Sequence, residues 1–222
     1  YVVGSFSGIA DVGSHRLTSL GRTDSFVAKF DANGESIWAF SFGGSGQDYA
    51  HSVTADSNGD IYVLGCFRGE VSFGSLTLSS RGGLDIYLIR MKESGEVLWA
   101  VGGGGTSDDY GKAIHMSEEG AVFIGGHFRK NAYFGSATLV SSGTEDGLLA
   151  KYNSSDGSLV WARSMGGAGV DRVQGMSGDG SGGVVLAGKF ELTSSFGDHR
   201  LVSAGFSDAF VARYDSKGSC VF

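Results

Sequence analysis

Proline is absent from the 222-residue chain, and cysteine occurs only twice. The lack of proline excludes proline-rich linkers and, despite 39 glycines, a collagen-like repeat. No apolar run approaches the length of about 18 residues that a membrane-spanning helix needs, so none is expected. Cys66 and Cys220 are too few for a disulfide framework and occupy non-equivalent places in the repeat described below, so we expect free thiols.

Basic residues are also scarce. Lys and Arg number 17 against 24 Asp and Glu, which gives a net charge of −7. Because phosphate backbones bind basic protein faces, this balance argues against a nucleic-acid partner. The hydrophobic fraction of 41% is too high for a disordered chain. The composition therefore indicates a folded domain, and by itself it assigns no function.

Several landmarks recur with a period of about 61 residues, which indicates an internal repeat. A Gly-x-Phe turn occurs four times, with Ser5, Cys66, His127 and Lys189 in the middle place. Three further landmarks keep the same register: Gly-x-x-Asp before an apolar run, a large aromatic residue, and an acid that follows a double glycine. Their members are Gly21, Asp24, Gly82, Asp85, Gly143, Asp146, Gly205 and Asp208; Trp38, Trp99, Trp161 and Phe222; and Asp48, Asp109 and Asp171.

Alternating apolar residues predict four short antiparallel strands per repeat, for example at residues 61–67, 85–91, 96–101 and 110–116. Asn-Gly and Asp-Gly turns separate them, a weaker apolar piece lies at 71–78, and Gly102–Gly105 is interpreted as a flexible strand exit. No segment has a sustained helical period. This pattern predicts an all-β fold made of β-propeller blades.

The predicted organisation is one propeller segment over residues 1–222. Its repeat units are 1–61, 62–122, 123–184 and a partial 185–222. Propellers usually hold 4 to 8 blades, so we expect a part of a longer ring, or a piece whose open edges a neighbour completes. An open, solenoid-like stack is the alternative.

The segment 21–39, GRTDSFVAKFDANGESIWA, resembles the SBBP-type bacterial β-propeller repeat, and Asp208–Tyr214 is a second close copy. The part from Ala28 to Trp38 is also distantly similar to the tryptophan-docking motif of quinoprotein propellers. The chain has too few blades and no adjacent cysteine pair for a quinone, so no cofactor is expected. The resemblance implies a propeller, little chemistry, and an extracellular or cell-envelope location.

The residues that recur in every unit are interpreted as structural, because a catalytic residue is usually unique. The repeated aspartates would accept backbone N–H groups at turns, although a ring of carboxylates that binds a cation or a basic ligand is the alternative. The tryptophans and Phe222 would pack between blades, unless exposed rings stack on sugars. Asp31-x-Asn33-Gly34-Glu35 resembles the start of a calcium loop but lacks its further carboxylates, so no metal site is expected.

The five histidines have no zinc-ligand spacing, and no catalytic constellation stands out. We therefore expect a non-enzymatic scaffold or binding module whose variable loops or strand edges contact a protein partner or the rest of a larger polypeptide. A carbohydrate-binding propeller is the first alternative, with exposed aromatics such as Tyr49, Tyr110 and Tyr133. An enzyme with a site in the propeller channel is the second, and it would need converging acids in one blade.

Overall fold

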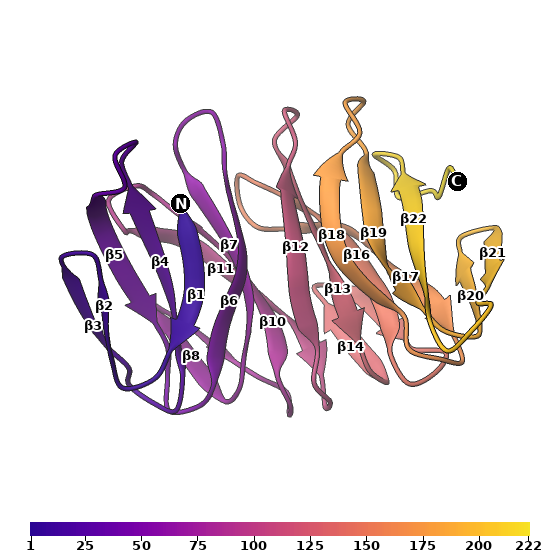
Figure 1. Ribbon diagram of the computed structural model, residues 1–222, viewed down its shortest axis with the longest axis horizontal. Coiled ribbons are helices and arrows are strands. Elements are labelled where there is room, and N and C mark those ends of the chain that lie inside the picture. Colours follow the sequence, from indigo (N-terminus) through magenta and orange to yellow (C-terminus); the bar gives the residue numbers. More distant parts are fainter.

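The computed structural model describes residues 1–222 as strands and turns, without helices. Figure 1 shows four upright sheets side by side in chain order, with β1, β6, β12 and β18 at the front. The all-β prediction is confirmed. No helix that could cross a membrane occurs.

The second and third sheets each contain four antiparallel blade strands. The second blade runs from its inner to its outer edge as β6 (Asp48–Ala55), β7 (Ile61–Phe67), β10 (Asp85–Met91) and β11 (Val97–Gly105). The third runs as β12 (Tyr110–Met116), β13 (Ala121–Phe128), β16 (Asp146–Asn153) and β17 (Leu159–Gly167). Each blade thus takes its inner strand from the end of one sequence unit and its other strands from the next unit.

The first and fourth sheets have three strands each. The first is β1 (Val2–Phe6), β4 (Asp24–Phe30) and β5 (Ser36–Phe42), and the fourth is β18 (Arg172–Gly178), β19 (Val184–Phe190) and β22 (Asp208–Tyr214). The first sheet has no counterpart of β6. Beside β22, Cys220 forms an isolated bridge with Tyr214 where a counterpart of β11 would begin. The predicted unit boundaries at 61/62 and 122/123 thus fall inside or beside β7 and β13, within the second and third sheets.

The weaker apolar pieces form hairpins rather than single connections. They are β2 (Ile9–Val12) with β3 (His15–Thr18), β8 (Glu70–Phe73) with β9 (Leu76–Ser79), β14 (Asn131–Phe134) with β15 (Ala137–Val140), and β20 (Thr193–Phe196) with β21 (His199–Val202). The later hairpins join the outer edge of the preceding blade: β14 pairs with β11 and β20 pairs with β17. These two hairpins therefore extend the sheet of the preceding blade, whereas β2–β3 and β8–β9 form separate two-stranded sheets.

This pairing corrects the expectation that Gly102–Gly105 is a flexible strand exit. These glycines continue β11, and Gly103–Gly105 pair with β14. A side chain has no room there, because a Cβ atom at residue 103 would lie 2.1 Å from the Phe134 ring. The glycines thus allow a hairpin to approach the strand, a purpose that a sequence reading of flexibility misses.

Three apolar cores lie between neighbouring sheets rather than inside one of them. The core between the second and third blades includes Leu64 and Leu88 from one side and Ile124 and Leu148 from the other. Every residue of β7 is buried, because this strand has a neighbouring sheet on each face. Full burial of one Leu or Ile side chain contributes about 1.5–3 kcal/mol to the free energy of unfolding. The stacking of blades therefore stabilises the fold.

A polar contact fixes the second blade to the third. The indole Nε1 of Trp99 donates to the carbonyl oxygen of Ser154 at 3.0 Å, and Arg90 donates to the same oxygen at 2.9 Å. Ser154 lies in the β16–β17 turn, whose Gly157 has a φ of 72° and a Cα so close to the indole that a Cβ would be 2.9 Å from it. We call this arrangement the turn latch.

The third junction repeats the turn latch. Trp161 Nε1 and Lys151 Nζ both lie 3.2 Å from the carbonyl oxygen of Ser216, and Gly218 lies over the Trp161 ring. The two aromatic and basic residues stand at equivalent repeat positions. One carbonyl oxygen in each turn thus accepts two donors from the preceding blade.

The remaining two aromatic positions differ. The Nε1 atom of Trp38 is buried without a hydrogen-bond partner in the protein, and Lys29 instead pairs with the side chain of Glu93. Phe222 is 56% exposed, so the expectation that it fills a wedge between blades does not describe this structure.

The turn latch predicts different costs for two matched substitutions. Trp99→Phe keeps an aromatic ring but loses the donor to Ser154, and it should lower the free energy of unfolding by about 1 kcal/mol more than Trp38→Phe, whose Nε1 has no partner. Urea unfolding followed by circular dichroism measures both. Equal losses would contradict an energetic role for the latch hydrogen bond.

Candidate functional site

The repeated aspartates form buried pairs. Asp24 and Asp48, Asp85 and Asp109, and Asp146 and Asp171 are all at most 2% exposed. In the second blade a Cβ atom at residue 104 would lie 2.7 Å from Asp85 Oδ1 and 2.9 Å from Asp109 Oδ2. Glycine is therefore required at position 104, because a Cβ atom would have no room and because side chains disfavour its φ of 152°. The double glycine allows two carboxyl groups to approach from two strands.

Hydrogen bonds distinguish the two acids of a pair. Asp85 Oδ2 accepts the backbone N–H of Arg81 at 3.0 Å, whereas its buried Oδ1 has no partner in the protein. Asp109 uses both oxygens to accept the N–H groups of Gly105 and Arg129, at 2.7 and 3.0 Å. Asp109 is therefore held by two backbone donors and Asp85 by one, and a proton bound by the pair is shared between two buried carboxyl groups.

The same arrangement recurs in the third blade. Asp146 Oδ1 is unpartnered, while Asp171 accepts hydrogen bonds from Gly167 N and Ser194 Oγ. In the first pair, Asp24 and Asp48 each keep one unpartnered oxygen. Asp208 accepts from Ala204 N at 2.7 Å and has no partner acid. No three His, Cys, Asp or Glu side chains are grouped to hold a metal ion.

Burial governs the protonation of these pairs. It raises the pKa of Asp85 to about 6, and it raises those of Asp48 and Asp109 to about 7, with a smaller contribution from the neighbouring acid at Asp48 and Asp109. Burial also raises the pKa of Asp146. Two buried carboxylates cannot both ionise cheaply at close range. These acids are closed off from solvent and hold the blade together.

The glycines of the Gly-x-x-Asp motif are needed for close backbone approach in three of four cases. A Cβ atom at Gly21, Gly82 or Gly143 would lie 2.2 to 2.7 Å from a carbonyl oxygen of the following segment. Gly205 has nothing within 4 Å. The first three therefore allow a loop from one strand to pass over the double-glycine segment of the same blade.

A different set of side chains meets on the inner strands, where the backbone repeats and the residues do not. The pairing register of each inner strand skips one residue, which is a β-bulge. The skipped residues are His51 in β6, Lys112 in β12 and Gln174 in β18. A bulge re-aims its side chain, so the three blades present three different polar groups at one recurring place.

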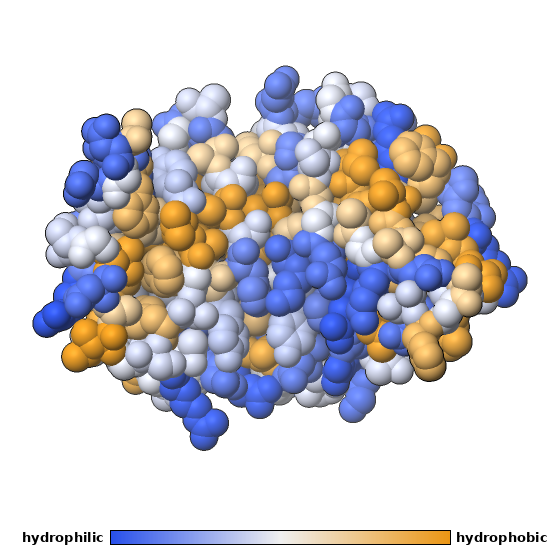
Figure 2. Space-filling view, in the orientation of Figure 1, coloured by the Kyte–Doolittle hydropathy of each residue, from blue (hydrophilic) through white to orange (hydrophobic).

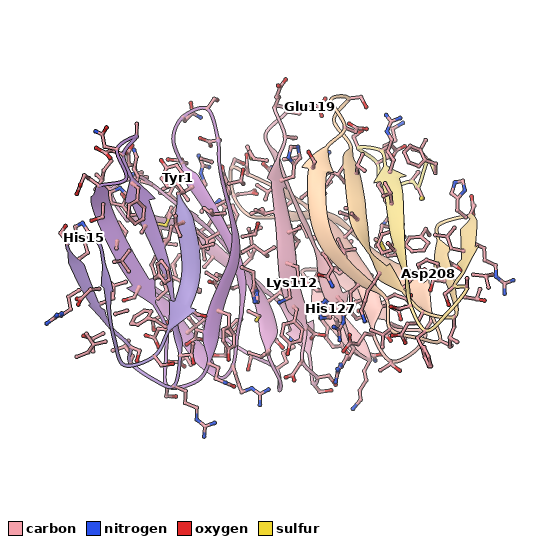
Figure 3. The ribbon with its side chains drawn as sticks, in the orientation of Figure 1. Tyr1, His15, Lys112, Glu119, His127 and Asp208 are labelled. Carbon is pink, nitrogen blue, oxygen red and sulfur yellow. The ribbon has the colours of Figure 1, made fainter.

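We define the axial cluster as His51, Tyr110, Lys112, His127, Glu145 and Arg172. Lys112 Nζ lies 3.1 Å from His51 Nε2 and 4.9 Å from the centroid of the Tyr110 ring. The Tyr110 ring stacks on His127, with 4.9 Å between centroids. Figure 3 places Lys112 and His127 near each other in the middle of the face it shows. Figure 2 shows hydrophilic surface in the middle of that face, between more apolar areas.

Glu145 supplies the negative charge of the axial cluster. Its side chain is only 1% exposed, and it accepts hydrogen bonds from Arg129 Nε at 2.8 Å and Arg172 Nε at 2.5 Å. Burial would raise the pKa of Glu145, but the hydrogen bonds from Arg172 and Arg129 hold it below the ordinary value. Glu145 is therefore ionised at neutral pH and fixes two guanidinium groups.

Both histidines of the axial cluster are neutral at neutral pH. Burial, aided by the charge of Lys112, lowers the pKa of His51 to about 4. Burial lowers the pKa of His127 to about 3, although Glu145 acts in the opposite direction. Neutral His51 can therefore accept a hydrogen bond from the Lys112 ammonium through Nε2.

The sequence contained one signal for this cluster. The middle residue of Gly-x-Phe changes from Cys66 to His127 to Lys189, while its flanking residues stay constant. That place lies on the strand next to the inner one, where His127 pairs with Tyr110 and Lys189 with Arg172. The bulges could not be predicted from the sequence, because a bulge depends on the pairing between two strands. Cys66 is fully buried, and burial raises its pKa to about 12, so it is no reactive thiol.

Comparison with known proteins agrees with this architecture. The all-β fold and the repeated motif resemble those of β-propeller repeats. Residues 37–65 match the family model described as SBBP, beta-propeller repeat, so the chain carries the SBBP-type repeat expected from its motifs. The matched segment runs from β5 through β6 into β7 and includes Gly43, Gly44 and Asp48.

The chain is also similar to a curated bacterial protein, the regulatory protein FlaEY of Caulobacter vibrioides. The two are 39% identical over 66 residues, which is 30% of this chain and 7% of that protein. The similarity thus spans a small part of a much longer relative.

The aspartate pair predicts a pH-dependent effect of Asp85→Asn. The native pair retains its proton up to pH 6–7, whereas the unfolded acid has a pKa of 3.8, so the native state binds more protons in this interval and its stability falls as pH rises. Asn cannot lose a proton, and its amide can donate toward Asp109. Relative to the natural protein, the free energy of unfolding of the variant should rise by roughly 1–3 kcal/mol between pH 4 and 7.

Asp109→Asn is the matched control. It presents an amide group to one of two backbone donors, Gly105 N or Arg129 N, so it should destabilise the fold by about 1–3 kcal/mol at pH 5 and at pH 7. Denaturant titrations at a series of pH values measure both variants. A stability difference for Asp85→Asn that stays flat or falls with pH would contradict the shared proton.

Proposed function

We propose that this chain is a non-enzymatic binding module that makes protein–protein contacts within a larger protein or assembly. The observation that supports the proposal most is that recurring polar residues and variable polar residues make different kinds of contact. Recurring residues engage backbone groups, as in the aspartate pairs and in the turn latches of Trp99 and Trp161. The residues that differ between blades gather on the inner strands, where Lys112 and Arg172 are only partly buried.

Two properties argue against an enzyme in this proposal. The aspartate pairs are at most 2% exposed, so a substrate could not reach them. The thiol of Cys66 is fully buried, and its raised pKa opposes formation of a thiolate. Both features suit a rigid frame, on which variable side chains make contacts.

Carbohydrate binding, expected as an alternative, gains no specific support. Tyr49 and Tyr110 stack on histidine rings, at 6.2 and 4.9 Å. Tyr133 is 39% exposed, but Arg81 lies over its ring at 5.4 Å. A cleft of about 550 Å³ between the β12–β13 and β18–β19 turns is lined by His115 but by no Phe, Tyr or Trp, the residues on which a sugar ring would stack.

The proposal of a larger protein is supported by the relative, of which the match covers only 7%. Location in the extracellular space or cell envelope is proposed on the SBBP resemblance alone. The charge balance of −7 remains in keeping with a partner other than nucleic acid.

An array experiment tests this function. Labelled protein is applied to one array of peptides and one of glycans. We expect signals on peptides, lost in the double variant Lys112→Ala/Arg172→Ala and kept in Arg200→Ala/Lys217→Ala, which removes the same charge from exposed residues outside the cluster. Signals confined to glycans, or peptide signals that both double variants lose equally, would overturn the proposal.

A further inference from the structure

Lys112 differs from the other partly buried lysines in what its ammonium contacts. Lys151 donates to the carbonyl oxygen of Ser216, and Lys29 pairs with Glu93. Lys112 has neither a carboxylate nor a carbonyl partner; it lies over the Tyr110 ring, and its one hydrogen-bond partner is the ring nitrogen of His51 at 3.1 Å. An ammonium has three N–H donors, so two of them have no partner in the protein.

Arg172 also has N–H donors without a partner in the protein. Its Nε is bound to Glu145, but its two terminal nitrogens make no hydrogen bond to the protein, and the side chain is 33% exposed. Arg172 and Lys112 are close enough for each charge to act on the pKa of His127, and burial lowers the pKa of Lys112, with a smaller contribution from Arg172. Neighbouring inner strands, β12 and β18, carry the two groups, and these strands lie side by side.

The local charge is positive although the chain is acidic. Lys112, Arg129 and Arg172 supply three positive charges and Glu145 supplies one negative charge, which leaves an excess of two. The net charge of the whole chain is −7. Because exposed charges are screened beyond about 8 Å at 0.15 M salt, the local excess determines what binds at this place.

We propose that Lys112 and Arg172, with His51 as a neutral neighbour, bind a carboxylate side chain of an acidic peptide segment. Arg172 already donates a hydrogen bond to the carboxylate of Glu145, and its open donors would hold a second carboxylate on the other side. The inference rests on the proposed binding function and names its ligand chemistry.

The shape of the surface favours an acid presented by a peptide over a small free acid. The 550 Å³ cleft lies at the β12–β13 and β18–β19 turns, and an apolar groove of about 200 Å³ lies beside β22. Neither is lined by a member of the axial cluster. A small acid would bury little surface on an open face, whereas a peptide adds contacts along the inner strands.

Binding of labelled hexaglutamate, measured by fluorescence anisotropy at 0.15 M salt, tests the proposal, with hexaglutamine as the uncharged probe. The natural protein should bind hexaglutamate more tightly than hexaglutamine. Lys112→Met should weaken hexaglutamate binding at least about tenfold, the effect of one charge-assisted hydrogen bond, and should leave hexaglutamine unaffected. Lys217→Met removes the same charge at an exposed place and should change affinity little.

A second measurement uses the unaltered protein, so it does not depend on whether a variant folds. The ¹⁵N signal of His51 Nε2 should shift on addition of hexaglutamate and stay in place with hexaglutamine, because a carboxylate draws the Lys112 ammonium toward itself. Equal weakening by Lys112→Met and Lys217→Met, an unmoved His51 signal, or binding of inorganic phosphate without hexaglutamate would overturn the proposal. Array peptides that need the axial cluster but show no preference for acids would refute this inference and leave the binding function intact.

Discussion

The fold depends on the contacts between neighbouring blades, and the carbonyl oxygen of Ser154 takes part in two of them. It accepts donors from Trp99 and Arg90 of the preceding blade, while Gly157 allows the turn to lie against the indole. A single blade has apolar residues on both faces of its central strands, so it cannot bury them alone. Stacking supplies the burial, and the turn latch, with the shared outer hairpins, sets the orientation of the stack.

The same constraint separates the residues that build the junctions between blades from the residues that are free to vary. The second and third junctions are built in the same way by residues that recur, and the indole nitrogens of Trp99 and Trp161 both donate to backbone carbonyl groups. The bulged positions of the inner strands take no part in the junction cores. His51, Lys112 and Gln174 can therefore differ from blade to blade without loss of the frame.

Much of the fold could be predicted from the sequence, since period-2 patterns and Asn-Gly turns act locally. The predicted strands at 61–67, 85–91 and 110–116 coincide with β7, β10 and β12. The outer hairpins and the extended Gly102–Gly105 segment could not be predicted, because their partners lie in the neighbouring repeat. The axial cluster was missed for the same reason: Glu145 and Arg172 are distant in sequence and meet only when two blades stack.

The sequence by itself determined an all-β chain with an internal repeat, because the alternation of apolar residues, the turn glycines and a recurring tryptophan are local properties of the chain. Only the tertiary structure decided that the blade starts at the inner strand, that the aspartates face each other in pairs, and that Phe222 lies exposed. It also decided that Lys112 lacks a counter-charge. These properties depend on distances between strands, and such distances are fixed only when the blades pack together.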